Sequence, residues 1–175
     1  MNQLIIYGSK YGSTKMYANE LSKRTNIKAI DFKKVESLDK INTVIYFGGL
    51  YAGGVLGLSE TIKKIDTYDD KKIIIITVGL SNPNAKENID NIKDSIKKQV
   101  PEKVFNKCKI FNLRGSIDYG KLNMMHKIMM KALYNKTKKL PPEKQTSESK
   151  ALIETYNKKV NFVDFDTLGK IIEII

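Results

Sequence analysis

The sequence predicts an α/β fold built on a doubly wound parallel sheet, and three observations lead to this fold class. Short apolar runs recur along the chain, and the run Ile73-Ile74-Ile75-Ile76 lacks the polar alternation of a half-exposed sheet. The segments between these runs carry apolar residues at helical spacing. Loops rich in glycine and hydroxyl side chains follow several of the runs. Ligands of such sheets bind at the carboxyl ends of the strands, so these loops are the candidate site.

Each apolar run is expected to form one strand that is buried on both faces. The expected strands cover residues 4–7, 27–31, 43–47, 73–78 and 110–113. Helical faces lie between them, and their apolar positions are Tyr17, Ala18 and Leu21, then Leu58, Ile62 and Ile65, then Ile89, Ile92, Ile96 and Val100. Thr14, Ser59 and Asn84 are suitable N-caps for these helices.

The end of the chain is expected to hold an insert. About 50 residues follow the fifth strand before the last helix, which is more than one connection needs. We therefore expect one domain over residues 1–175 with a basic, methionine-rich helical insert over about 115–162. Helical patterns cover 121–139 and 147–159. Asp164 or Asp166 is expected to cap the last helix.

The composition narrows the class of protein. The net charge of +12 favours phosphates, carboxylates, nucleic acids or an anionic membrane as partners. Nucleic acid is disfavoured, because the lysines are spread along the chain and no nucleic-acid-binding signature occurs. No apolar run of about 18 residues and no signal peptide occur, which predicts a cytoplasmic protein. The single Cys108 is expected to be structural, since one cysteine forms neither an internal disulfide nor a metal site alone.

The first loop, in the stretch YGSKYGSTK from Tyr7 to Lys15, is suited to a phosphate. A strand that passes into a helix through glycines exposes backbone N–H groups at the helix N-terminus. The spacing does not fit a Walker loop or a dinucleotide fingerprint, which disfavours nucleoside triphosphates and NAD. A terminal phosphate monoester remains, held by N–H groups and by the hydroxyls of Ser9, Ser13 and Thr14. Alternatively, the loop is only a tight turn.

The segment Ser9-Lys10-Tyr11-Gly12-Ser13-Thr14 resembles the phosphate loop of the flavodoxins, commonly T-x-T-G-x-T. The similarity continues through Tyr51-Ala52-Gly53 and Val78-Gly79-Leu80-Ser81 and spans most of the chain. The resemblance implies a five-stranded sheet of order 2-1-3-4-5 with helices on both faces, and FMN as the cofactor. The residues that it implies for FMN binding are Ser9, Lys10, Tyr11, Gly12, Ser13 and Thr14 at the phosphate, and Leu50, Tyr51, Ala52, Gly53, Gly79, Leu80 and Ser81 at the ring. No metal site is expected.

The chemistry of the second loop is compatible with a flavin ring. A flat, amphipathic ring requires apolar or aromatic contacts on its faces and backbone groups at its edge. Residues 50–57 provide both, and their glycines let the backbone approach closely. Alternatively, Tyr51 covers the sheet edge and the glycines serve turns.

Within the flavodoxin-like proteins, the insert resembles the quinone-dependent protoporphyrinogen dehydrogenases. The resemblance rests on Leu113-Arg114-Gly115-Ser116-Ile117-Asp118-Tyr119, on the methionine-rich basic helix that follows, and on Val163-Asp164-Phe165. It implies that FMN removes hydrogen from protoporphyrinogen IX and passes the electrons to a membrane quinone. The alternatives are an FMN electron carrier between redox proteins, with no substrate chemistry of its own, and an adaptor for nucleic acid or membrane that has lost its flavin.

The sequence allows more than one role for the residues of the insert. Leu122, Met125, Met129 and Leu133 form one stripe among many lysines, which suits a membrane surface, a flat apolar substrate with carboxylates, or simple core packing. Arg114 could bind a propionate or pair with Asp118. His126 is the single histidine, and we expect a surface or structural role rather than proton transfer.

Overall fold

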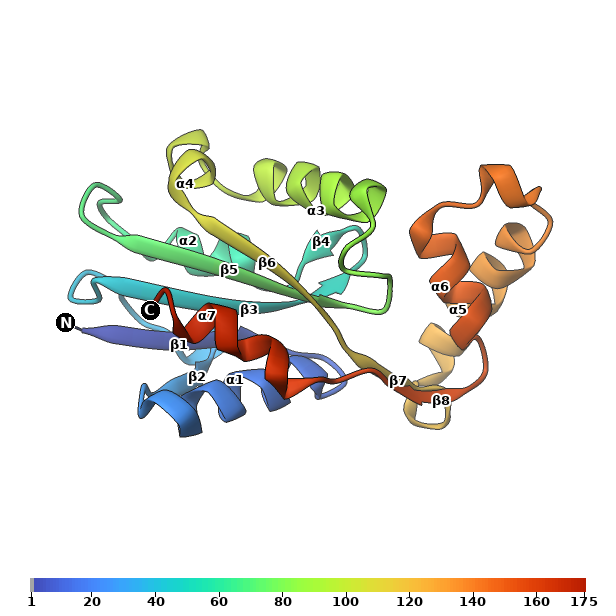
Figure 1. Ribbon diagram of the computed structural model, residues 1–175, viewed down its shortest axis with the longest axis horizontal. Coiled ribbons are helices and arrows are strands. Elements are labelled where there is room, and N and C mark those ends of the chain that lie inside the picture. Colours follow the sequence, from blue (N-terminus) through green and yellow to red (C-terminus); the bar gives the residue numbers. More distant parts are fainter. Residues whose placement is uncertain (1) are drawn as a thin grey trace.

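The computed structural model describes residues 2–175 and has a central parallel sheet with helices on both faces (Figure 1). The strands lie in the order β2-β1-β3-β5-β6, and the short β4 pairs antiparallel with the end of β3. With β4 set aside, this is the order 2-1-3-4-5 expected from the sequence. The strands of this sheet are β1 (Gln3–Gly8), β2 (Ala29–Asp31), β3 (Thr43–Tyr51), β4 (Gly54–Val55), β5 (Lys72–Gly79) and β6 (Lys109–Arg114).

The central strand β5 divides its side chains between two cores. Ile73 and Ile75 belong to one core, and Ile74 and Ile76 belong to the other, because successive side chains of a strand point to opposite faces. All four are at most 4% exposed, as the run without polar alternation predicted. The first core is completed by α2 (Leu58–Ile62), α3 (Lys86–Gln99) and α4 (Glu102–Lys107), and the second by α1 (Ser13–Thr25) and α7 (Gly169–Ile172).

The expected N-caps of the first three helices are wrong. The observed N-caps are Gly12 for α1, Gly57 for α2 and Ala85 for α3, in place of Thr14, Ser59 and Asn84. Gly12 and Gly57 have φ angles of 104° and 76°, a region that serine and threonine avoid. The chain therefore enters these two helices through a glycine turn rather than a hydroxyl cap.

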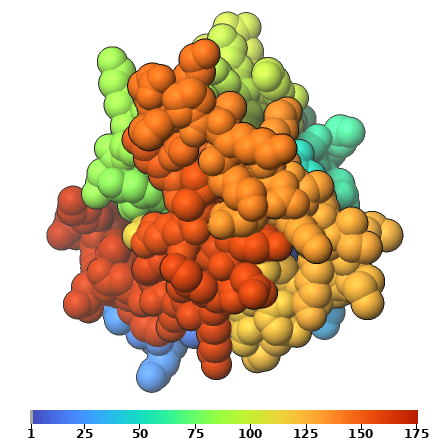
Figure 2. All heavy atoms as spheres, turned by 90° about the vertical axis from the view of Figure 1, so that its right-hand side faces the viewer, coloured from blue at the N-terminus to red at the C-terminus, as the bar shows by residue number. Residues whose placement is uncertain are grey.

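The insert lies at the end of the sheet where the parallel strands finish (Figure 1). It leaves through β7 (Ser116–Asp118) and returns through β8 (Lys159–Asn161), and these two strands pair antiparallel. Between them lie α5 (Met124–Thr137) and α6 (Ser147–Thr155), both shorter than the sequence predicted. Figure 2 views the molecule from this end, where the orange and red spheres of the insert cover most of the face. Within residues 2–175, no helix is long and apolar enough to cross a bilayer.

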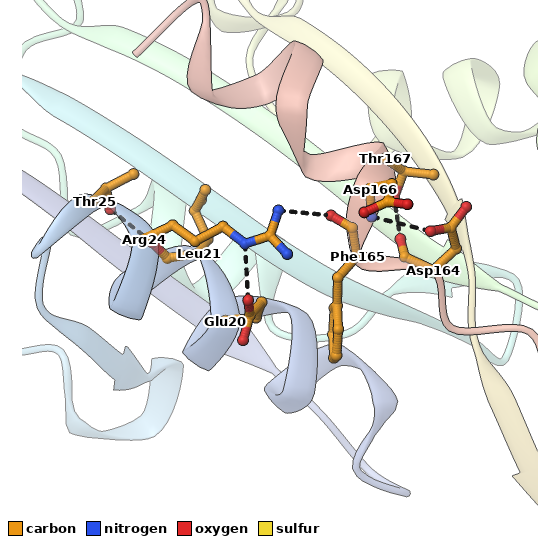
Figure 3. Close-up of polar contacts among 8 residues, drawn as sticks. All are labelled: Glu20, Leu21, Arg24, Thr25, Asp164, Phe165, Asp166 and Thr167. Carbon is orange, nitrogen blue, oxygen red and sulfur yellow. Dashed lines mark hydrogen bonds and ion pairs between the residues drawn. The ribbon is translucent and has the colours of Figure 1, made fainter.

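Contacts with α1 fix the chain where it returns from the insert (Figure 3). Arg24 pairs with Glu20 at 2.8 Å and donates from Nη1 to the carbonyl of Phe165 at 3.1 Å. The side chain of Asp164 accepts a hydrogen bond from the N–H two residues later at 3.0 Å, and so caps the short 3₁₀ helix before α7. Asp164 was one of the two expected caps. The aspartate-aromatic pair of the sequence therefore has a structural role here.

Candidate functional site

The loops that follow β1, β3 and β5 line one cavity of about 450 Å³. This volume is typical of small-molecule sites. Of the predicted site residues, the cavity is lined by Lys10, Tyr11, Ser13, Thr14, Leu50, Tyr51, Ala52, Gly53, Gly79, Leu80 and Ser81. Ser9 and Gly12 lie in the first loop but outside this lining. Segments far apart in the sequence thus meet at the carboxyl end of the sheet, as a doubly wound fold requires.

The first loop presents the start of α1 to this cavity. Gly12 donates its N–H to the hydroxyl of Ser9 at 3.2 Å, so the predicted phosphate ligand Ser9 also shapes the loop. The helix has no side-chain N-cap, and its first N–H groups remain available to an anion. Thr14 is only 3% exposed, and its side chain lies in the first turn of the helix beside the cavity.

The second loop is a tight hairpin between β3 and β4. Its turn passes through Ala52 and Gly53, which have φ angles of 50° and 78°. The helix α3 holds this turn in place, because Ser95 donates to the carbonyl of Gly53 at 2.8 Å and Gln99 bonds to both backbone groups of Val55. The strand extends further than the sequence predicted, so Tyr51 stands at its end and faces the cavity.

The third loop is anchored to the start of the insert. Arg114 donates from Nε to the carbonyl of Leu80 at 2.9 Å, and its guanidinium lies 3.7 Å from the centre of the Phe162 ring. It also pairs with Glu154 of α6 at 3.5 Å. Asp118 is not its partner, because that carboxylate accepts from the N–H of Gly120. Arg114 therefore joins the third loop to both ends of the insert.

His126 of α5 closes the cavity from the side of the insert. Its Nε2 lies 2.7 Å from the hydroxyl of Tyr51, and its Nδ1 is hydrogen-bonded to the hydroxyl of Tyr11. It is 6% exposed, which rules out the surface role and leaves the structural role as the other expected alternative. Asn123 caps α5 by accepting from the N–H of His126 at 2.8 Å, which fixes the start of the helix. No spacing in the sequence predicts this contact, because it depends on how the insert folds back.

The insert adds a mostly apolar part of the lining. It includes Leu122, Met129, Met130 and Leu133, with Glu148 as an acidic group. On the opposite side, the ammonium of Lys10 lies 4.1 Å from the centre of the Tyr51 ring. The cavity therefore has a polar end at the first loop and an apolar end beneath α5.

Two glycines keep space beside the hydroxyls of the first loop. A Cβ atom at Gly49 would lie 3.1 Å from the hydroxyl oxygen of Thr14, and one at Gly115 would lie 2.8 Å from that of Ser13. Hydroxyls, free N–H groups, an aromatic ring and apolar side chains together suit a phosphorylated ligand with a flat ring.

Within residues 2–175, no group of three or more His, Cys, Asp or Glu side chains could hold a metal ion.

A family model described as flavodoxin domain matches residues 4–144. The chain belongs to the flavodoxin-domain family. This membership and the lining of the cavity both support FMN as the cofactor, and the family accounts for the observed strand order. The finer resemblance to protoporphyrinogen dehydrogenases has no counterpart among the matches, and no curated protein matches the chain.

Several solved structures are similar to this flavodoxin-domain protein. A flavoprotein in complex with FMN from Lactobacillus acidophilus shares 8% identity over 65% of this chain and 91% of its own, with a TM-score of 0.43. A flavodoxin mutant from Fusobacterium nucleatum bound to flavin mononucleotide shares 17% identity over 70% of this chain and 72% of its own, with a TM-score of 0.41. An FMN-dependent NADH-azoreductase from Bacillus anthracis, in complex with FMN, shares 12% identity over 72% of this chain and 92% of its own, with a TM-score of 0.42.

Proposed function

We propose that this flavodoxin-domain protein is an FMN-dependent oxidoreductase whose donor substrate binds between the cofactor loops and α5. The observation that carries the proposal is the insert itself, which extends the cavity beyond the three loops with apolar side chains. An electron carrier needs only an exposed ring edge, whereas a substrate of appreciable size needs a compartment. FMN would supply the two-electron redox chemistry that protein side chains lack.

The cavity provides contacts for each part of FMN. The free N–H groups of α1 and the hydroxyls of Ser13 and Thr14 would hold the phosphate. Tyr51, Leu50 and Leu80 would contact the faces of the ring, with backbone groups of the second and third loops at its edge.

Protoporphyrinogen IX is the donor that we propose, and a quinone is the acceptor. The proposal is supported by the sequence block that begins at Leu113 and by the chemistry of α5, where methionines alternate with lysines. An apolar macrocycle with carboxylate arms is complementary to such a surface. Arg114 is already engaged by the third loop and α6, so the lysines are the better candidates for the carboxylates.

We further propose that α5 contacts an anionic membrane, where a quinone would be dissolved. Its outer face exposes Met124, Met125 and Ile128 at 75%, 76% and 64%. Exposed lysines flank them at positions 121, 127, 131, 136, 138 and 139. Apolar side chains among basic residues are typical of a surface that lies on anionic lipid.

Vesicle sedimentation tests this surface with a matched control. The double variant Met125→Glu with Ile128→Glu should lose binding to vesicles of phosphatidylglycerol and phosphatidylcholine. Met16→Glu changes an exposed methionine of α1, 45% exposed, and should leave binding intact. Equal binding by both variants would contradict the membrane proposal.

The redox function is tested by the colour of the protein. The purified protein should carry FMN, which is released on denaturation and identified by chromatography. Anaerobic addition of protoporphyrinogen IX should bleach the flavin absorbance, and a menaquinone analogue should restore it. If the donor leaves the absorbance unchanged while a reduced redox protein bleaches it, the protein is an electron carrier instead.

A further inference from the structure

Tyr51, His126 and Tyr11 form one continuous hydrogen-bonded chain from three separate parts of the fold. Tyr51 ends β3, His126 lies in the first turn of α5, and Tyr11 belongs to the loop before α1. The imidazole lies between the two hydroxyls and uses both of its nitrogens. Both tyrosine rings also meet the imidazole edge to face, with ring centres 5.6 and 5.7 Å apart. This arrangement orders all three side chains at one place.

The chain runs along the wall of the cavity, which all three residues line, to the exposed Tyr11. Tyr51 lines the cavity at the end of β3, and His126 is buried. Tyr11 is 41% exposed and so reaches solvent. A neutral imidazole has one N–H donor and one acceptor nitrogen, and each hydroxyl can both donate and accept. Such a sequence of groups can therefore pass a proton along its length without any side chain moving far.

We propose that Tyr51, His126 and Tyr11 form a proton relay between the cavity and solvent. The proposal rests on the proposed oxidoreductase function. Two-electron oxidation of a donor removes one hydrogen as a hydride, for which bound FMN would be the acceptor, and a second as a proton that must leave. The Tyr51 hydroxyl receives this proton and passes its own to Nε2 of His126. The proton on Nδ1 then moves to Tyr11, whose hydroxyl proton is released to water. This shift leaves the imidazole proton on Nε2, and the imidazole returns to its starting form by losing that proton to water and taking one from water on Nδ1.

The surroundings of Tyr11 keep its hydroxyl neutral. Burial raises the pKa of Tyr11, with the nearby Lys10 ammonium opposing that effect. A neutral hydroxyl retains the donor that a relay needs. The charged groups that face the chain are Lys10, against the Tyr51 ring, and Glu148 of α6, which lines the same cavity. Lys127, the next residue of α5, points its ammonium toward the carbonyl of Gly120 at 3.5 Å.

A purely structural latch between α5 and the loops is the competing explanation, and nuclear magnetic resonance separates the two. His126 is the only histidine, so its imidazole nitrogens give unambiguous signals. In the FMN-loaded protein, a relay predicts one dominant neutral tautomer with the proton on Nδ1. Tyr11→Phe and Tyr51→Phe should each shift the nitrogen that loses its partner. The relay is excluded if the signals are unchanged in both variants, or if the proton stays on Nε2.

Single-turnover kinetics provide the second test. His126→Gln can bond to a hydroxyl but does not carry a proton, so donor-driven bleaching of the flavin should slow about 100-fold. The FMN dissociation constant should change little, and added imidazole should restore part of the rate. Tyr11→Phe should slow bleaching and alter its pH profile and solvent isotope effect. Tyr68→Phe is the control, because the Tyr68 hydroxyl bonds to the carbonyl of Ile62 outside the cavity.

The outcomes separate the relay from the proposed function. An unchanged rate in His126→Gln would overturn the relay and leave the proposed function standing. Absence of bleaching in the wild-type protein would overturn the proposed function.

Discussion

Thr14 is the residue on which the phosphate assignment can be tested most directly. Its side chain is buried beside the cavity in the first turn of α1, where no side chain caps the helix. A hydrogen bond from a hydroxyl to a charged group contributes about 1.5–3 kcal/mol, so Thr14→Val should weaken FMN binding about 10-fold or more. Fluorescence titration measures this affinity. Thr25→Val makes the same change at the other end of α1 and should have no such effect; equal affinities in the two variants would refute the assignment.

Tyr119 offers a second prediction at this scale, because its buried hydroxyl has no hydrogen-bond partner among residues 2–175. Burial raises its pKa to about 12, and the nearby Tyr156 acts in the same direction. Because the folded state disfavours the ionised hydroxyl, the free energy of unfolding does not depend on this proton below the unfolded pKa of about 10 and falls as the pH rises toward 12. Below about pH 10, the unpaired hydroxyl still costs the folded state the free energy of its desolvation. Tyr119→Phe should therefore raise stability by about 1 kcal/mol at pH 7 and reduce its loss above pH 10. Urea unfolding across pH 7–11.5 measures both effects, and a destabilised variant at pH 7 would contradict the prediction.

At the scale of elements, the sequence predicts what depends on local patterns. The five parallel strands β1, β2, β3, β5 and β6 were expected near their observed positions, because a run such as Ile73–Ile76 has to be buried on both faces wherever it occurs. The helix starts were wrong because hydroxyl residues were favoured as caps, whereas the turns at Gly12 and Gly57 require left-handed backbone. The short α4 was not expected as a separate element, since it is divided from α3 only around Pro101.

The part of the site that lies at strand ends was predicted, and the part that comes from the insert was not. The three loops follow directly from strand ends, so most of their residues meet at one cavity as expected. The contribution of His126 depends on the packing of α5 against Tyr11 and Tyr51, which are distant in the sequence. Because nothing local encodes that packing, the sequence left a surface and a structural role open for the histidine and did not predict its place in the cavity.

The insert can be removed at a position that the structure defines. Asp118 of β7 lies directly opposite Lys159 of β8, so a two-residue Asn-Gly turn can replace residues 119–158. We expect this variant to fold and to bind FMN, because the three loops and both cores of the sheet remain. Anaerobic turnover of the donor should be lost, since the apolar end of the cavity is removed. Full turnover by the shortened protein would show that α5 and α6 play no part in substrate binding.

At the scale of the whole molecule, the net charge of +12 acts on the same site as these local features. A positive field stabilises negative charge added to the cavity, so it favours reduction of bound FMN and binding of carboxylates. The lysines of α5 and the ammonium of Lys10 concentrate this field near the cavity. One electrostatic property thus links the proposed donor, the anionic membrane and the redox potential.

The last prediction follows from that field. The two-electron potential of bound FMN should be more oxidising than that of acidic flavodoxin carriers, and it should fall with salt. The Debye length decreases from about 30 Å at 0.01 M to about 3 Å at 1 M ionic strength, which removes the contribution of distant lysines. Lys10→Gln should lower the potential more than Lys23→Gln in the last turn of α1, because Lys10 lies against Tyr51. Spectroelectrochemical titration measures each value. A potential that salt leaves unchanged would show that the charge of the whole protein does not act on the cofactor, and one that rises with salt would show that the local field is negative.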